Sequence, residues 1–195
     1  RGVVRRVRAW TVHSKVSRVP TRTLAVADSP PIVTRAGWRA DESIRRDDPD
    51  LAPALRNAIV HHTAGSNTYT REQAPALVRA IMAYHVQANG WDDIGYNALV
   101  DRFGTVYEGR FGGLDANVVG AHAKGFNAGA FGIAVLGEFT TVAPPKASID
   151  ALVRTLAWRL DLAHVDPLAT LAVVSAGNER CQPGVPVFLR AIGGH

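Results

Sequence analysis

Apolar and β-branched runs in the middle of the chain predict buried strands. Residues 57–64 read Asn-Ala-Ile-Val-His-His-Thr-Ala, a short β-branched run that delivers two histidines. Residues 131–137 predict a second buried strand. Residues 97–101 and 105–108 flank a short turn that ends in Gly104, which predicts a hairpin with this glycine at a positive φ angle.

Two other segments place apolar residues at helical spacing. The first follows Thr70-Arg71-Glu72-Gln73, which has the spacing of a capping box, and Gly90 supplies its C-terminal stop. The second follows Pro144-Pro145, where Ser148 is predicted to cap a helix that continues through His164. Strands therefore alternate with helices, and the pattern favours an α/β fold.

The two ends of the chain differ in character. Residues 1–31 are basic, lack a clear period and end at a proline pair, which predicts an N-terminal arm or linker. Residues 32–195 are expected to form one domain, with Trp38 anchoring an irregular covering segment near its start. No apolar run approaches the ~20 residues that span a bilayer, so we expect no membrane span.

The formal net charge of +5 comes almost entirely from arginine and favours anionic surroundings. The arginines form no helical stripe and are not interleaved with aromatic residues, so we expect no nucleic-acid partner and keep a basic nucleic-acid-associated domain as the weakest reading. An anionic cell-wall polymer satisfies the charge equally well. Cys181 is the only cysteine, which excludes an intrachain disulfide and leaves the redox compartment open.

The candidate chemistry lies in histidines spread along the chain. A hydrolytic zinc site needs roughly three protein ligands and an open position for water. His61 or His62, His122 and His195 are candidates by residue type, although each alone also fits a hydrogen-bonded structural role. Neighbouring side chains on a strand face opposite ways, so only one of His61 and His62 can point into a given site.

Two further residues carry both a functional and a structural interpretation. Tyr96 lies in a Gly-Tyr-Asn step between a helix and a strand, where a phenol can reach into a cleft or pack as a half-buried aromatic. Cys181 is a metal ligand by type alone, but it has no Cys-x-x-Cys partner and equally fits a solvent-facing thiol in a proline-rich turn.

Taken in order, these motifs resemble the peptidoglycan recognition protein family, which includes the type 2 N-acetylmuramoyl-L-alanine amidases and the phage lysozyme-type amidases. The resemblance runs from about residue 32 to residue 195. Its segments are residues 59–64, Tyr84-His85, residues 90–97, residues 104–110, Gly120-Ala121-His122, residues 131–134 and Gly194-His195. The leading Arg35-Ala36-Gly37-Trp38 resembles the segment that precedes the domain in secreted actinobacterial-type members.

The resemblance implies a mixed central β-sheet flanked by helices, with Zn²⁺ at one end of a peptide-binding groove. It implies zinc-dependent hydrolysis of the lactyl-L-alanine amide of peptidoglycan by a secreted or cell-wall-associated bacterial protein, which we expect to be a monomer. In this reading the zinc ligands are His61 and His195, the catalytic tyrosine is Tyr96, and the residues that line the muramyl-peptide groove are His85, Trp91 and His122.

The family's third zinc ligand is a Cys or Asp that follows the Gly-His pair. Here the chain stops at His195, and Cys181 precedes that histidine and does not occupy the family's position. We therefore expect the amidase domain to be C-terminally incomplete in this chain. A peptidoglycan-binding module without catalysis is the alternative.

Overall fold

The computed structural model describes residues 27–195, so most of the predicted arm over residues 1–31 lies outside the described residues. The elements are, in chain order, β1 (Ile32–Val33), a 3-10 turn (Glu42–Ile44), β2 (Asn57–His62), α1 (Ala74–Ala83), a π-helical turn (Tyr84–Ala88), β3 (Ala98–Val100), β4 (Val106–Glu108), β5 (Ala130–Val135), α2 (Lys146–Leu162), β6 (Thr170–Val174), β7 (Pro186–Arg190) and β8 (Ile192–Gly194).

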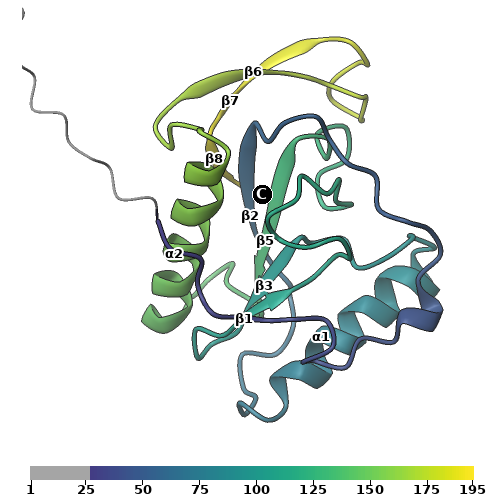
Figure 1. Cartoon of the computed structure of the whole chain (residues 1–195), viewed down its shortest axis with the longest axis vertical. Helices are drawn as coiled ribbons and strands as arrows, with labels where there is room; N and C mark the ends of the chain where they lie inside the picture. The colour runs from purple at the N-terminus through teal and green to yellow at the C-terminus, as the bar shows by residue number, and fades with distance from the viewer. Residues whose placement is uncertain (1–26) are drawn as a thin grey trace, which may run out of the picture.

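Six strands form one sheet in the order β1-β4-β3-β5-β2-β8 (Figure 1). Only β3 and β4 are antiparallel, and the other neighbours run parallel. The sheet is therefore mixed, and it confirms the α/β fold that the alternation of strands and helices predicted. Strands β6 and β7 form a separate antiparallel pair that arches over the end of β2 and β8.

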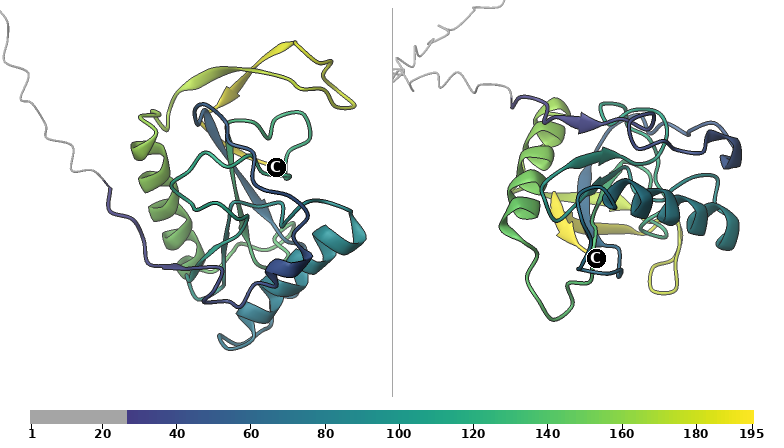
Figure 2. Two further views of the ribbon diagram at one scale, coloured as in Figure 1. Left: turned by 45° about the vertical axis from the view of Figure 1, so that its right-hand side comes forward. Right: turned by 90° about the horizontal axis from the view of Figure 1, so that it is seen from below.

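The two helices lie on opposite sides of this sheet (Figure 2). Alternate residues of β3 separate the two cores, because Ala98 and Val100 pack towards α2 whereas Leu99 packs with α1. The α1 side also buries Trp38, which is 0% exposed and donates its indole N–H to the carbonyl of Glu108 at 2.7 Å. The predicted anchoring role of Trp38 is confirmed.

Helix α1 follows the predicted pattern and then departs from it. The backbone N–H of Thr70 donates to Oε1 of Gln73 at 2.8 Å, so one half of the predicted capping box forms. Beyond Ala83 the helix widens into the π-helical turn, which the sequence did not predict, and Gly90 ends the segment with φ 76°. Such turns insert a residue and change the direction of the side chains that follow.

The predicted cap of the second helix was wrong. Helix α2 begins at Lys146 after Pro145, whose φ of −57° already suits a helix start, and Ser148 lies inside the first turn. The buried Ser148 hydroxyl instead donates to the carbonyl of Asp101 at 2.9 Å, which ties α2 to the end of β3. The helix ends at Leu162, and His164 beyond it has φ 54°.

The predicted hairpin between β3 and β4 forms with Gly104 at φ 82°. The Asp101 carboxylate closes the turn by accepting from the N–H groups of Phe103 and Thr105 at 2.8 Å each. Within residues 27–195, no helix combines the length and the apolar character that crossing a bilayer requires.

Candidate functional site

His61 lies near the end of β2 and points to the α1 side of the sheet. Its side chain shares that face with Ile59, while His62 faces the other way and accepts a hydrogen bond from the N–H of Phe139 at 2.9 Å. His61 is 7% exposed. Only one of the two histidines therefore faces the other imidazoles, as strand alternation predicted, and the structure shows that it is His61.

His195 reaches His61 from the neighbouring strand. Strand β8 runs parallel to β2 with Gly194 opposite Val60, and the N–H of His195 donates to the Val60 carbonyl at 3.0 Å. This pairing brings the rings of His61 and His195 to a centroid distance of 4.8 Å. Two imidazoles that are 134 positions apart in the sequence therefore meet.

His122 completes a cluster of three imidazoles. Its Nδ1 lies 3.0 Å from Nε2 of His61, and its ring packs against Gly120 and Gly132. A Cβ atom at Gly132 would lie 2.2 Å from the His122 ring, so only glycine leaves room there. The structure places His122 against His61, and its predicted role in the substrate groove stays a prediction.

Tyr96, His85 and Trp91 form the other side of the cluster. The ring of Tyr96 lies 5.4 Å from that of His61 and 5.5 Å from that of His85, and Trp91 lies 4.6 Å from His85. The π-helical turn supplies His85, whose Nδ1 accepts from the N–H of Gly95 at 3.0 Å. This hydrogen bond fixes the His85 ring beside the tyrosine.

A buried ion pair supports the segment that carries Tyr96. The guanidinium of Arg35 lies 3.1 Å from Asp93, and both side chains are at most 5% exposed. Asp93 also accepts from the N–H groups of Ile94 and Phe111, at 2.6 and 2.8 Å. The sequence did not assign Arg35 this role, because nothing in its local pattern shows that an arginine before Trp38 is buried.

Burial favours the neutral form of His61, His85 and His122. It lowers the pKa of His61 to about 3, with a further contribution from the three neighbouring imidazoles. Burial and the nearby charge of Arg110 lower the pKa of His85 to about 4. Burial also lowers the pKa of His122 to about 4, although a hydrogen bond to the Ala130 backbone acts in the opposite direction. Burial raises the pKa of Tyr96, so the phenol keeps its proton.

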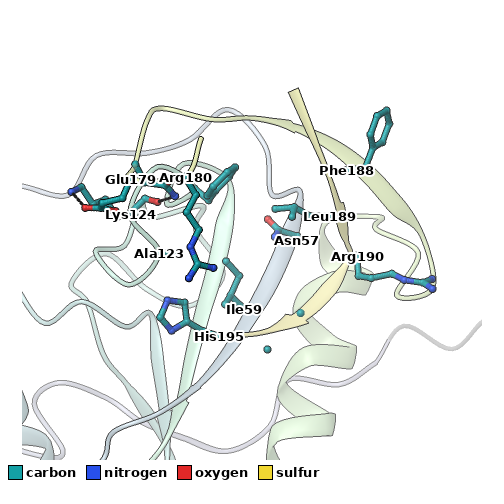
Figure 3. Close-up of a pocket in the computed structure, with 14 residues that line it drawn as sticks. Asn57, Ile59, Ala123, Lys124, Glu179, Arg180, Phe188, Leu189, Arg190 and His195 are labelled. Carbon is teal, nitrogen blue, oxygen red and sulfur yellow. Dashed lines mark hydrogen bonds and ion pairs between the residues drawn. The ribbon is translucent and has the colours of Figure 1, made fainter. Parts of the chain in front are cut away.

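Two cavities adjoin the cluster from different sides. One, of about 270 Å³, lies between α1 and the sheet and is lined by His85, Tyr96 and Thr63 among others. The other, of about 740 Å³, lies beneath the β6–β7 hairpin and includes His195 in its lining (Figure 3). A ligand bound at the imidazoles can therefore extend in two directions.

The donor set fits a zinc site in part. Neutral imidazole is a preferred zinc ligand, and His61 and His195 are neighbours with their rings in contact. Across residues 27–195, no group of three or more His, Cys, Asp or Glu side chains is arranged to hold a metal ion. Cys181 lies in the loop between β6 and β7 and is not part of either cavity lining.

Comparisons with known proteins agree with the fold and the motifs. Residues 51–184 match the family model described as N-acetylmuramoyl-L-alanine amidase. The chain is 38% identical over 120 residues to peptidoglycan-recognition protein SC2 of Drosophila simulans, a match that covers 62% of this chain and 62% of the fly protein. It is 35% identical over 144 residues to peptidoglycan recognition protein 1 of Bos taurus, covering 73% of each chain.

A solved structure with the same fold is that of human PGRP-IβC in complex with glycosamyl muramyl pentapeptide. Its TM-score is 0.62 at 31% identity, over 71% of this chain and 80% of that one.

Proposed function

Because the chain belongs to the N-acetylmuramoyl-L-alanine amidase family of peptidoglycan recognition domains, we propose that it hydrolyses the amide between the lactyl group of N-acetylmuramic acid and the L-alanine of the stem peptide. The observation that carries this proposal is the meeting of His61 and His195 on adjacent parallel strands, with Tyr96 beside His61. The substrate places the site of action at the bacterial cell wall.

The proposed cofactor is Zn²⁺, with His61 and His195 as two of its protein ligands. Their contact supports this assignment, and the low pKa of His61 keeps that ring in the form that binds metal. When bound, zinc supplies an activated water and polarises the scissile carbonyl. A third protein ligand, which catalytic zinc sites require, is not found among residues 27–195.

The remaining residues position the substrate and stabilise developing charge. The protonated phenol of Tyr96 donates a hydrogen bond to the carbonyl oxygen as negative charge develops, a contribution on the order of 3 kcal/mol in a site that excludes water. His85 packs edge-on against Tyr96 and lines the same cavity, and Trp91 packs against His85 from its other side. His122 holds the His61 ring in place through their 3.0 Å contact.

Cleavage of a defined muropeptide tests the proposal. Purified protein loaded with zinc should release the stem peptide, a chelator should abolish release, and added zinc should restore it. Tyr96→Phe should slow cleavage by about 10²-fold with little change in binding. Tyr84→Phe is the matched control, because Tyr84 lines the same cavity but is 61% exposed. Equal rates for Tyr96→Phe and wild type would exclude the assigned role.

Recognition without cleavage is the second candidate function. It is favoured by the donor set, because no three His, Cys, Asp or Glu side chains within residues 27–195 are arranged to hold a metal ion, and a hydrolytic zinc needs about three ligands. This reading predicts muropeptide binding with no product and less than one zinc per chain by elemental analysis. Stoichiometric zinc accompanied by cleavage would reject it.

A further inference from the structure

Asn97 directly follows Tyr96 in the chain, and its side chain is buried, with 4% of the residue exposed. Its Oδ1 accepts from the N–H of Gly132 at 2.8 Å, and its Nδ2 donates to the carbonyl of Val118 at 2.8 Å. One amide group therefore joins three segments that are far apart in the sequence. These are the residues before β3, the strand β5 and the segment that leads to Gly120.

The surrounding backbone explains why an amide is needed at this position. The carbonyl of Tyr96 accepts from the N–H of Arg110, and the carbonyl of Asn97 accepts from the N–H of Gly109, at 2.8 Å each. Both carbonyls are thus bonded to the segment after β4. The buried N–H of Gly132 needs an acceptor of its own, and Oδ1 of Asn97 supplies it. The Gly132 carbonyl in turn accepts from the N–H of Asn97 at 2.8 Å.

The first consequence of this arrangement concerns the Tyr96 ring. The ring lies 5.4 Å from that of His61 and 5.5 Å from that of His85, measured between centroids. The backbone from which it projects is bonded to β5 through both the N–H and the Oδ1 of the next residue, Asn97. Asn97 therefore fixes the point on β5 beside which the tyrosine leaves the backbone.

The second consequence concerns His122, whose ring is enclosed by two glycines. A Cβ atom would lie 2.2 Å from this ring at Gly132 and 2.5 Å from it at Gly120. Asn97 bonds the N–H of Gly132 directly, and it bonds the carbonyl of Val118 two residues before Gly120. The two surfaces that enclose the His122 ring are thus joined through one side chain.

We infer that Asn97 is a positioning residue, which sets the relative position of Tyr96 and His122 where both rings contact His61. The positioning depends on geometry alone, whereas its effect on cleavage rests on the proposed function. A misplacement of about 1 Å costs on the order of 10²-fold in rate, and a loss confined to the transition state lowers kcat without raising KM.

Asn97→Asp tests the inference with almost no change in side-chain shape. The aspartate keeps an acceptor for the N–H of Gly132 but presents an oxygen, in place of a donor, to the carbonyl of Val118. NMR on metal-free protein should show weaker nuclear Overhauser contacts of the Tyr96 ring with His61 and of the His122 ring with Gly132. On zinc-loaded protein, kcat should fall by about 10²-fold while KM changes less than about threefold.

Asn97→Leu separates geometry from charge, because leucine is similar in size, carries no charge and makes neither hydrogen bond. It should weaken the same ring contacts. Ser148→Ala is the matched control, since it also removes a buried side-chain donor to a backbone carbonyl, that of Asp101, but on the α2 side of the sheet. Its unfolding midpoint should fall as in Asn97→Asp, while the ring contacts and kcat stay unchanged.

Unchanged ring contacts in Asn97→Asp overturn the inference, whether or not the protein is an amidase. Loss of the whole fold in Asn97→Asp also overturns it, because Asn97 would then stabilise the domain and not specifically the site. Normal ring contacts in Asn97→Leu assign the effect of the aspartate to its charge and likewise overturn it. If the ring contacts weaken in both variants but wild type binds muropeptide without cleaving it, the positioning stands and only the proposed function fails.

Discussion

Gly132 is the position where one added methyl group should disturb the site most. It lies on β5 opposite Ile59, and the His122 ring covers its Cα. A Cβ atom there would lie 2.2, 2.4 and 2.5 Å from three ring atoms of His122. His122 cannot retreat freely, because its other side contacts His61. In Gly132→Ala, the ring must therefore move and lose its 3.0 Å contact with His61.

Two terms set the expected cost of Gly132→Ala. Overpacking a well-filled site costs about 1–3 kcal/mol, and losing a hydrogen bond between neutral groups costs about 0.5–1.5 kcal/mol. We expect a loss of about 3 kcal/mol in the free energy of unfolding, which corresponds to roughly 6–12 °C in Tm for a domain of this size. Cleavage and zinc affinity should fall with it, since His61 loses its support.

Urea unfolding measures this loss, with Gly193→Ala as the matched control. Gly193 lies on β8 of the same sheet, and a Cβ atom there would meet nothing within 4 Å, so the control should be neutral. The sharper test repeats Gly132→Ala in a His122→Ala background, where the obstacle is gone and the cost should fall below 1 kcal/mol. An equal cost in both backgrounds would refute the clash with His122 as its cause.

Two other perturbations probe the supports of the site. Arg35→Ala leaves the Asp93 carboxylate buried without its ion-pair partner and should lower the free energy of unfolding by about 3–5 kcal/mol, measured in urea. Removing the exposed arginine in Arg154→Ala should lower it by less than ~0.5 kcal/mol. Similar losses in both variants would show that the ion pair is dispensable. The folded-state pKa of His85, about 4, lies below the ordinary value of 6.5, so the unfolded chain binds the extra proton. The contribution of His85 to the free energy of unfolding is complete above pH 6.5 and decreases as the pH falls. It levels off below about pH 4, after a total loss near 3 kcal/mol. His85→Gln should flatten the change in unfolding free energy between pH 7 and pH 5, and an unchanged slope would assign that change to other groups.

The sequence predicted the elements whose local pattern coincides with their final environment. Strand β5, helix α1 and the Gly104 turn each show their period or turn residue within a short window. The cap at Ser148 failed because the hydroxyl found a tertiary acceptor, the carbonyl of Asp101, which no local pattern reveals. The π-helical turn was missed for a similar reason, since Tyr84–Ala88 reads as ordinary helix and its widening has no local signal.

In the candidate site, too, local sequence patterns predicted some features, and contacts between distant segments set the others. Strand alternation limited the pair at the end of β2 to one inward histidine, and ordered motifs brought His195 and Tyr96 into consideration. Their contacts with His61 depend on the parallel pairing of β8 with β2, which spans most of the chain.

The location of the site follows from which residues stand beside β2. On the α1 side of the sheet, Ile59 has Gly132 on one flank and Gly193 on the other, and His61 has Ala134 beside it. Small residues at these positions leave a hollow that α1 does not fill, because α1 packs further along against Leu99 and Tyr107. The ring of His122 covers Gly132 in this hollow. His61 is therefore buried between a cavity lined by α1 and a cavity lined by the β6–β7 hairpin.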